Sequence, residues 1–170
     1  SHGYRTRDNA WYRKSFLLDE SLADKQLFLC FEGTAVNAEF YFNGSLMARS
    51  FSAYTETTFD ITERAYFDGR TNVLAVHING FETEGWWYEG GGIYRHVWLV
   101  KTDLVSVDLY GVYIKPQKQT ETLWSAPIEV SVRNDSFDGK RVKLECEILD
   151  DKGKTVATAA CSGDILRKDK

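Results

Sequence analysis

Apolar and polar residues alternate along much of this chain with a period of two, which is the period of a β-strand. One such run spans residues 36–43 and ends at Asn43-Gly44, a dipeptide typical of a tight hairpin turn, and a second run spans residues 72–78. Because alternate side chains of a strand point to opposite faces of a sheet, one apolar set in each run should face a core. These expected core residues are Phe40, Phe42, Leu74, Val76 and Ile78.

Short strands of this kind recur through the first part of the chain, with turn residues between them. Further strands are expected at residues 11–18, 27–31, 57–61 and 94–100. No sustained helical stripe of apolar residues occurs before residue 116. Short strands at this spacing predict an all-β fold, and we expect a jelly-roll sandwich over residues 1–103.

The pattern changes in the last third of the chain, where aromatic residues become sparse. A polar stretch at residues 117–122 is interpreted as a linker, and strands are expected at 128–132, 142–148 and 155–161. We assign residues 104–170 to an immunoglobulin-like β-sandwich domain, a fold that needs about seven strands. Two alternatives remain open: this second domain is incomplete, or it takes additional strands from residues 104–114.

The overall composition is that of an ordinary globular protein with a slightly acidic charge. The 170 residues include 21 Lys and Arg against 25 Asp and Glu, a net charge of −4, and no block of basic residues. This balance argues against nucleic-acid and membrane partners. No apolar run approaches the ~18 residues of a transmembrane helix, and no signal-peptide pattern is visible, so the compartment stays open.

The three cysteines do not form a metal-binding or disulfide pattern. They are odd in number, and no two have the spacing of a zinc ligand pair. Cys30 lies in an apolar run and is expected to be buried as a small hydrophobic residue. Cys146 and Cys161 lie in neighbouring predicted strands, but we do not expect a bond between them.

A search for catalytic motifs yields no complete set. The sequence contains no nucleophile elbow, metal-binding helix motif, phosphate-binding glycine loop or dinucleotide fingerprint. His77 and His96 lie within predicted strands and are interpreted as sheet-surface or core residues. A carboxylate pair for glycoside hydrolysis cannot be located from the sequence. We therefore assign no catalytic residue, no metal and no cofactor to this chain.

Residues 82–95 are the part of the sequence richest in candidate functional side chains. The segment combines acidic residues, the adjacent Trp86 and Trp87, and three consecutive glycines. One interpretation is a loop whose aromatic residues cover one end of the sandwich. The other is a carbohydrate-facing loop, because sugar rings stack on aromatic faces and hydrogen-bond to charged side chains. Composition alone does not decide between them.

The same segment carries a family resemblance. Residues 87–99, Trp-Tyr-Glu-Gly-Gly-Gly-Ile-Tyr-Arg-His-Val-Trp-Leu, resemble a signature in the N-terminal domain of glycoside hydrolase family 2, which includes β-galactosidases, β-glucuronidases and β-mannosidases. Similar motifs of that domain occur in the expected order at residues 11–16, 31–33 with 38–44, 59–62 and 72–76. The resemblance is strong over residues 11–101. Residues 104–170 look like the opening strands of the family's immunoglobulin-like domain.

This resemblance implies a retaining, β-galactosidase-like glycosidase whose acid/base and nucleophile glutamates lie on a C-terminal (β/α)8 barrel. Because the sequence ends at Lys170, we expect a non-catalytic N-terminal fragment whose partners are carbohydrate and that barrel, and we leave open a homo-oligomer of the full-length protein. A free-standing carbohydrate-binding or structural module is the alternative. Glu82, Glu84 and Trp86 are expected nearest the substrate, with Trp86 or Trp87 partly exposed.

Overall fold

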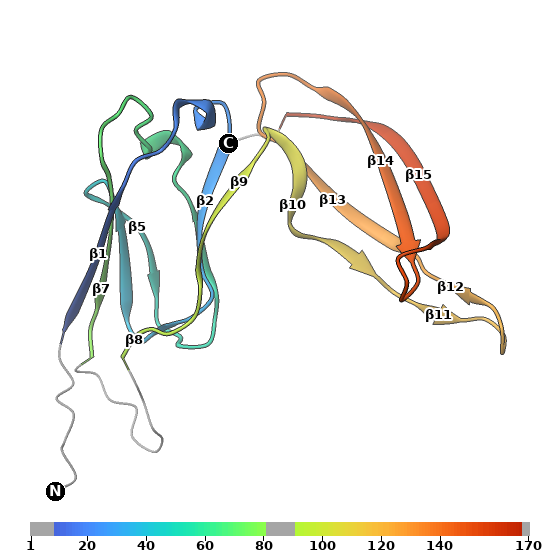
Figure 1. Ribbon diagram of the computed structural model, residues 1–170, viewed down its shortest axis with the longest axis horizontal. Helices are drawn as coiled ribbons and strands as arrows, with labels where there is room; N and C mark the ends of the chain where they lie inside the picture. Colours follow the sequence, from blue (N-terminus) through green and yellow to red (C-terminus); the bar gives the residue numbers. More distant parts are fainter. Residues whose placement is uncertain (1–8, 81–90, 168–170) are drawn as a thin grey trace, which may run out of the picture. The chain divides into compact units, whose positions relative to one another are not determined.

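The computed structural model describes residues 9–80 and 91–167 and shows an almost entirely β protein (Figure 1). Helical backbone in this part of the chain is confined to two three-residue 3₁₀ turns, Glu20–Leu22 and Thr62–Arg64. The all-β prediction is therefore confirmed. The chain divides into two compact units, residues 1–102 and residues 103–170.

The first unit is a sandwich of two main antiparallel sheets. The strands of the first sheet, in order across it, are β1 (Ala10–Phe16), β7 (Asn72–Ile78), β4 (Ala38–Phe42) and β5 (Ser45–Ser50). The strands of the second sheet are β6 (Thr57–Asp60), β2 (Gln26–Phe31) and β9 (Val97–Thr102). A short pair is formed by β3 (Thr34–Ala35) and β8 (Gly92–Ile93). Most paired strands are distant in sequence, as in a jelly roll.

The hydrophobic core of this unit lies between the two sheets. All five residues predicted to point inward are buried, and Phe40, Phe42 and Ile78 have no exposed surface. Phe31 of β2 contacts the opposite sheet, since its ring centroid lies 4.6 Å from that of Phe40. Aromatic pairs at this separation add to the stabilisation from burial alone. The alternation in the sequence thus identified the inner face of both strands correctly.

The Asn43-Gly44 dipeptide forms the predicted turn between β4 and β5. Both residues have positive φ, 47° and 83°, which is the requirement of a two-residue type I′ hairpin. The Asn43 side chain also joins this turn to β7. Its Nδ2 donates to Oδ1 of Asn72 at 2.9 Å, and its Oδ1 accepts from the backbone N–H of Val73 at 2.8 Å. Asn72 is fully buried, so these hydrogen bonds satisfy polar atoms that water cannot reach.

The second unit is built from three pairs of antiparallel strands. Strand β10 (Val105–Ile114) pairs with β13 (Ile128–Asn134), and β14 (Lys140–Leu149) pairs with β15 (Thr155–Ile165). One alternative for this unit was that it takes additional strands from residues 104–114. In the structure, residues 105–114 do supply one of its strands. The register of β10 shifts between Val107 and Val112, where Tyr110 has a φ of 57°. The immunoglobulin-like assignment of residues 104–170 stays a prediction.

One expectation for this unit was wrong. Residues 117–122, interpreted as a linker, contain strand β11 (Gln117–Lys118), which pairs with β12 (Trp124–Ser125) in a short hairpin. Two-residue strands of mostly polar side chains show no apolar alternation, so the pattern on which the interpretation relied was not present there.

The cysteines are unpaired, as expected. Cys30 is buried, with 4% of its surface exposed. In the β14–β15 ladder Cys146 lies opposite Ala159, whereas Cys161 lies opposite Leu144. The two thiols are therefore diagonal neighbours across the ladder, and diagonal positions are roughly 7–8 Å apart. That separation is too large for a disulfide without movement of the backbone.

Candidate functional site

The residues predicted to lie nearest the substrate, Glu82, Glu84 and Trp86, are outside the described residues, as is Trp87. The segment that carries them joins the C-terminal end of β7 to β8. These site assignments therefore stay predictions. What the structure does describe is the surface of the first sheet next to the end of β7.

A row of four side chains crosses that surface, one from each strand of the first sheet. Trp11 of β1 lies opposite His77 of β7, His77 lies opposite Glu39 of β4, and Glu39 lies opposite Arg49 of β5. The neighbours of His77 and Glu39 along their strands point into the core, so both residues face outward. The core alternation and the strand register together produce this outward row.

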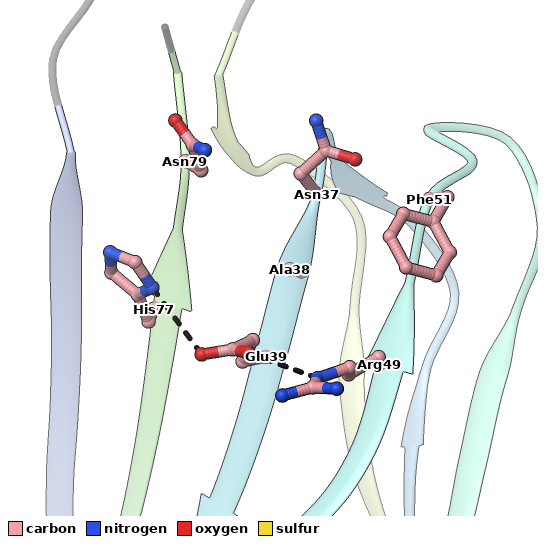
Figure 2. A pocket seen from close by; sticks show the side chains of 7 residues that line it. All are labelled: Asn37, Ala38, Glu39, Arg49, Phe51, His77 and Asn79. Carbon is pink, nitrogen blue, oxygen red and sulfur yellow. Dashed lines mark hydrogen bonds and ion pairs between the residues drawn. The ribbon is translucent and has the colours of Figure 1, made fainter. Parts of the chain in front are cut away.

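A hollow of about 300 Å³ lies over part of the row, at the end of the sheet where β7 ends and β4 begins (Figure 2). Its lining comes from three sequence segments, residues 37–39, 49–51 and 77–79. Asn37 precedes β4, Asn79 follows β7, and Phe51 follows β5. Figure 2 shows Glu39 below these three residues, with His77 on one side and Arg49 on the other.

Glu39 is held by three donors or potential donors. Tyr41 donates its hydroxyl proton to Oε2 at 2.7 Å, and Arg49 donates from Nε to Oε1 at 3.0 Å. The Nδ1 atom of His77 lies 3.6 Å from Oε2. The hydrogen bond from Tyr41 first, and then the bond and charge of Arg49, hold the pKa of Glu39 below its ordinary value. At neutral pH the hollow therefore contains a fixed, ionised carboxylate.

An aromatic surface borders His77 on the side away from Glu39. The Trp11 ring stacks on the imidazole with a centroid separation of 4.6 Å and an interplanar angle of 24°. It also lies 5.7 Å from the ring of Tyr41. Trp11 is nevertheless 62% exposed. The interpretation of His77 as a sheet-surface residue is confirmed.

A second histidine–carboxylate contact lies on the other sheet. Glu32, directly after β2, accepts a hydrogen bond from Trp98 Nε1 at 2.7 Å and lies 3.1 Å from Nδ1 of His96. These bonds, with that from Trp98 the larger, lower the pKa of Glu32. His96 is exposed, as expected for a sheet surface. We interpret this cluster as a tie between β2 and β9, since it joins the end of one strand to the start of its hydrogen-bonded neighbour.

The chemistry of these clusters suits binding better than proton transfer. A glycosidase acid needs a raised pKa so that it can donate a proton near neutral pH, whereas the pKa values of Glu39 and Glu32 are lowered. Over residues 9–80 and 91–167, no three His, Cys, Asp or Glu side chains gather in a way that could hold a metal ion. None of the helices in the same residues is long and apolar enough to cross a membrane.

Glu39, Arg49 and Phe51 were not singled out from the sequence. The outward direction of Glu39 and His77 was implicit in the alternation of their strands, because Glu39 directly precedes the predicted core residue Phe40 and His77 lies between two such residues. The proximity of Glu39 to His77 could not be predicted in this way, because it depends on the pairing of β4 with β7, which are more than thirty positions apart in the sequence. Phe51 lies beyond the end of a strand that has no clear alternation of its own.

The antiparallel sandwich with these strand pairings defines a galactose-binding-domain-like module. A family model described as the glycosyl hydrolase 2 galactose-binding domain-like family matches residues 3–87, half of the chain. The chain belongs to this family, and the resemblance to glycoside hydrolase family 2 is confirmed.

Individual relatives support the same family assignment. The chain is 33% identical to beta-galactosidase BoGH2A of Bacteroides ovatus over 91% of its own length and 18% of the relative's. It is 27% identical to a beta-glucuronidase of Formosa agariphila, covering 92% of this chain and 19% of the relative. A solved beta-glucuronidase from glycoside hydrolase family 2 superposes with a TM-score of 0.90 at 25% identity, over 96% of this chain and 19% of that one. The chain thus spans about a fifth of the length of these relatives.

Proposed function

We propose that this chain is the non-catalytic N-terminal part of a retaining glycoside hydrolase that acts on β-linked glycosides, with β-galactosides as the first candidate substrates. One observation carries the proposal. Nearly all of this chain aligns with a β-galactosidase, yet it accounts for only 18% of that enzyme. The remaining four fifths leave room for a separate catalytic domain.

In this role the first unit helps to shape the substrate pocket of a catalytic barrel in the same protein. Strand β7, which precedes residues 81–90 in the sequence, ends at Ile78 next to the outward row of β1, β7, β4 and β5. Glu82, Glu84 and Trp86, within residues 81–90, are the residues we assign to substrate proximity. The two catalytic carboxylates, which lie about 5–5.5 Å apart in retaining enzymes, are assigned to the barrel.

The second candidate is a carbohydrate-binding module that does not depend on an attached catalytic domain. The hollow over Glu39 favours it, because an aromatic rim beside fixed polar groups is suited to binding a sugar in its own right. A purely structural role predicts no binding of sugar to this chain.

Hydrolysis of nitrophenyl β-galactoside and nitrophenyl β-glucuronide separates these functions. We expect no turnover by the 170-residue chain and clear turnover by the longer protein whose reading frame contains it. A longer protein that binds sugar without hydrolysing either substrate would favour the module. Turnover by the 170-residue chain that disappears when one of its acidic residues is replaced would contradict the non-catalytic assignment.

A further inference from the structure

We propose that the hollow formed by β4, β5 and β7 is a binding site for one ring of a neutral sugar. The site is built from Glu39, Arg49 and Phe51, with Asn37 and Asn79 at its end. None of these belongs to the segment to which we assigned substrate proximity. The inference depends on the proposed function only for the β-configuration of the glycoside, because its chemistry is drawn from the hollow itself.

The size of the hollow fits a single ring. Its volume of about 300 Å³ lies at the lower end of the roughly 300–1,000 Å³ range of small-molecule sites. Glu39, Arg49 and Phe51 all line it, and Figure 2 shows the Phe51 ring near Arg49. A pyranose over the ion pair would have one face within reach of the phenyl ring.

Phe51 supplies the apolar surface that a sugar ring requires. Three quarters of this side chain is exposed to solvent, although it directly follows a strand of the sandwich. A single exposed aromatic residue is common on protein surfaces and indicates nothing by itself. Here the exposed ring shares one hollow with an arginine, a carboxylate and two amides, which is the combination of apolar and oriented polar groups found in ligand sites.

The polar groups of the hollow provide both donors and acceptors. Arg49 uses Nε to bind Glu39, and its two terminal amino groups have no partner within residues 9–80 and 91–167. Each oxygen of Glu39 accepts one hydrogen bond from the protein and can accept another. A sugar hydroxyl both donates and accepts, so adjacent hydroxyls of one ring can bind the guanidinium and the carboxylate together.

The charges of the hollow select a neutral ligand. Glu39 and Arg49 are directly paired, so they contribute no net charge. A uronate carboxylate placed over this pair would approach the fixed negative charge of Glu39, and an ammonium group would approach Arg49. Both arrangements place like charges close together, which is unfavourable. A neutral ring incurs neither repulsion.

Titration of the 15N-labelled 170-residue chain tests the site directly. The probes are the methyl β-glycosides of galactose, glucose and mannose as neutral ligands, and methyl β-glucuronide as the anionic one. We expect at least one neutral glycoside to shift the signals of Asn37, Glu39 and Asn79, and the glucuronide to bind at least about tenfold more weakly. Absence of shifts with all three neutral glycosides, shifts confined to residues outside the hollow, or tighter binding of the glucuronide would each overturn the proposal.

Matched variants separate the site from nonspecific effects. Phe51→Ala and Arg49→Gln should each weaken binding at least about fivefold. The controls are Tyr54→Ala, which removes another highly exposed aromatic residue, and Arg70→Gln, which removes another exposed arginine paired through Nε with a carboxylate. Neither lines the hollow. Equal losses in the site and control variants would contradict the proposal, and thermal melts show that each variant remains folded.

This binding experiment and the hydrolysis experiment can fail independently. An inactive longer protein would refute the proposed glycosidase function but would leave sugar binding by the 170-residue chain in place. An active longer protein whose 170-residue part binds no neutral glycoside in the hollow would support the glycosidase function and refute the binding site.

Discussion

Both units of this protein contain strands in which apolar and polar residues alternate, but the apolar side chains are buried to very different extents. Along β7 of the first unit, Leu74, Val76 and Ile78 alternate with outward residues and are 6%, 1% and 0% exposed. Along β14 of the second unit, Leu144 and Ile148 alternate in the same way but are only half-buried. Every buried hydrophobic residue within residues 9–80 and 91–167 belongs to the first unit.

The physical difference lies in what faces each strand. Strand β7 is hydrogen-bonded on both sides, to β1 and β4, and its apolar face is covered by the second sheet of the sandwich. Strand β14 is paired with β15 alone within the described part of the chain. Period-two alternation therefore reports which face of a strand is apolar, and burial depends on a second layer that the strand's own sequence does not encode.

The polar side chains of the two units also differ, in how firmly they are held and how exposed they are. In the first unit, Glu39 is held by hydrogen bonds from Tyr41 and Arg49. In the second unit, the ion pair of Lys143 and Glu145 lies on an exposed face, with about two thirds of each side chain accessible. Groups held by several partners are suited to binding a ligand, because little further ordering is needed when it arrives.

The largest expected effect is the loss of a core aromatic residue in the first unit. Phe40→Ala removes a fully buried ring that contacts both Phe31 and Phe59. We expect a loss of about 3–5 kcal/mol in the free energy of unfolding, from lost burial and the resulting cavity. Chemical denaturation followed by tryptophan fluorescence measures it. A loss below about 1 kcal/mol would mean that the sandwich core is less tightly packed than the structure shows.

A matched pair of leucines tests the comparison between the units. Leu74→Ala should destabilise the first unit by about 2–5 kcal/mol, because this side chain is buried in the core. Leu144→Ala should cost less than about 1.5 kcal/mol, since its side chain remains partly in water in both states. Equal costs would show that the β14–β15 face is covered in solution.

A smaller difference in unfolding free energy is expected between substitutions of two polar turn residues, Asn43 in the first unit and Asp150 in the second. Asn43→Ala removes the hydrogen bond to Asn72 and takes away the acceptor of the half-buried Val73 N–H, so we expect a loss of about 1–3 kcal/mol. Asp150→Ala removes two hydrogen bonds from backbone N–H groups in the β14–β15 turn, but water can replace them there. Its cost should be about 0.5–1 kcal/mol. Denaturant melts of both variants provide the test, and a reversed order would contradict it.

The smallest expected effect is the pH dependence contributed by Glu39. Because folding lowers its pKa, the ionised carboxylate stabilises the fold above the ordinary glutamate pKa of about 4.3 and loses that contribution as pH falls through the lower folded-state value. Glu39→Gln should therefore lower Tm at pH 7, and its difference from wild type should shrink towards pH 3, roughly one unit below the ordinary value. Glu145→Gln, which removes an exposed partner in the second unit, is the control. A Tm difference that is constant from neutral to acidic pH would rule out this linkage.

Much of the first unit could be predicted from local features of the sequence. The inner face of β4 followed from Phe40 and Phe42, and the hairpin followed from Asn43-Gly44, because alternation and turn geometry depend on neighbouring residues only. The hairpin of β11 and β12 was missed for the same reason, since its short polar strands carry no such local signal.

The sequence by itself determined the positions of many strands, though not of β5, β11 or β12, and the apolar faces of β4 and β7. Through ordered motifs such as residues 87–99 it also determined the family. The assignment of Glu82, Glu84 and Trp86 to the substrate rests on that family resemblance and stays a prediction. Only the tertiary structure decided which strands lie side by side, and hence that Glu39 meets Arg49 and His77 beneath a hollow. Pairing between distant strands depends on how whole sheets bury their apolar faces against each other, and no local run of residues contains that information.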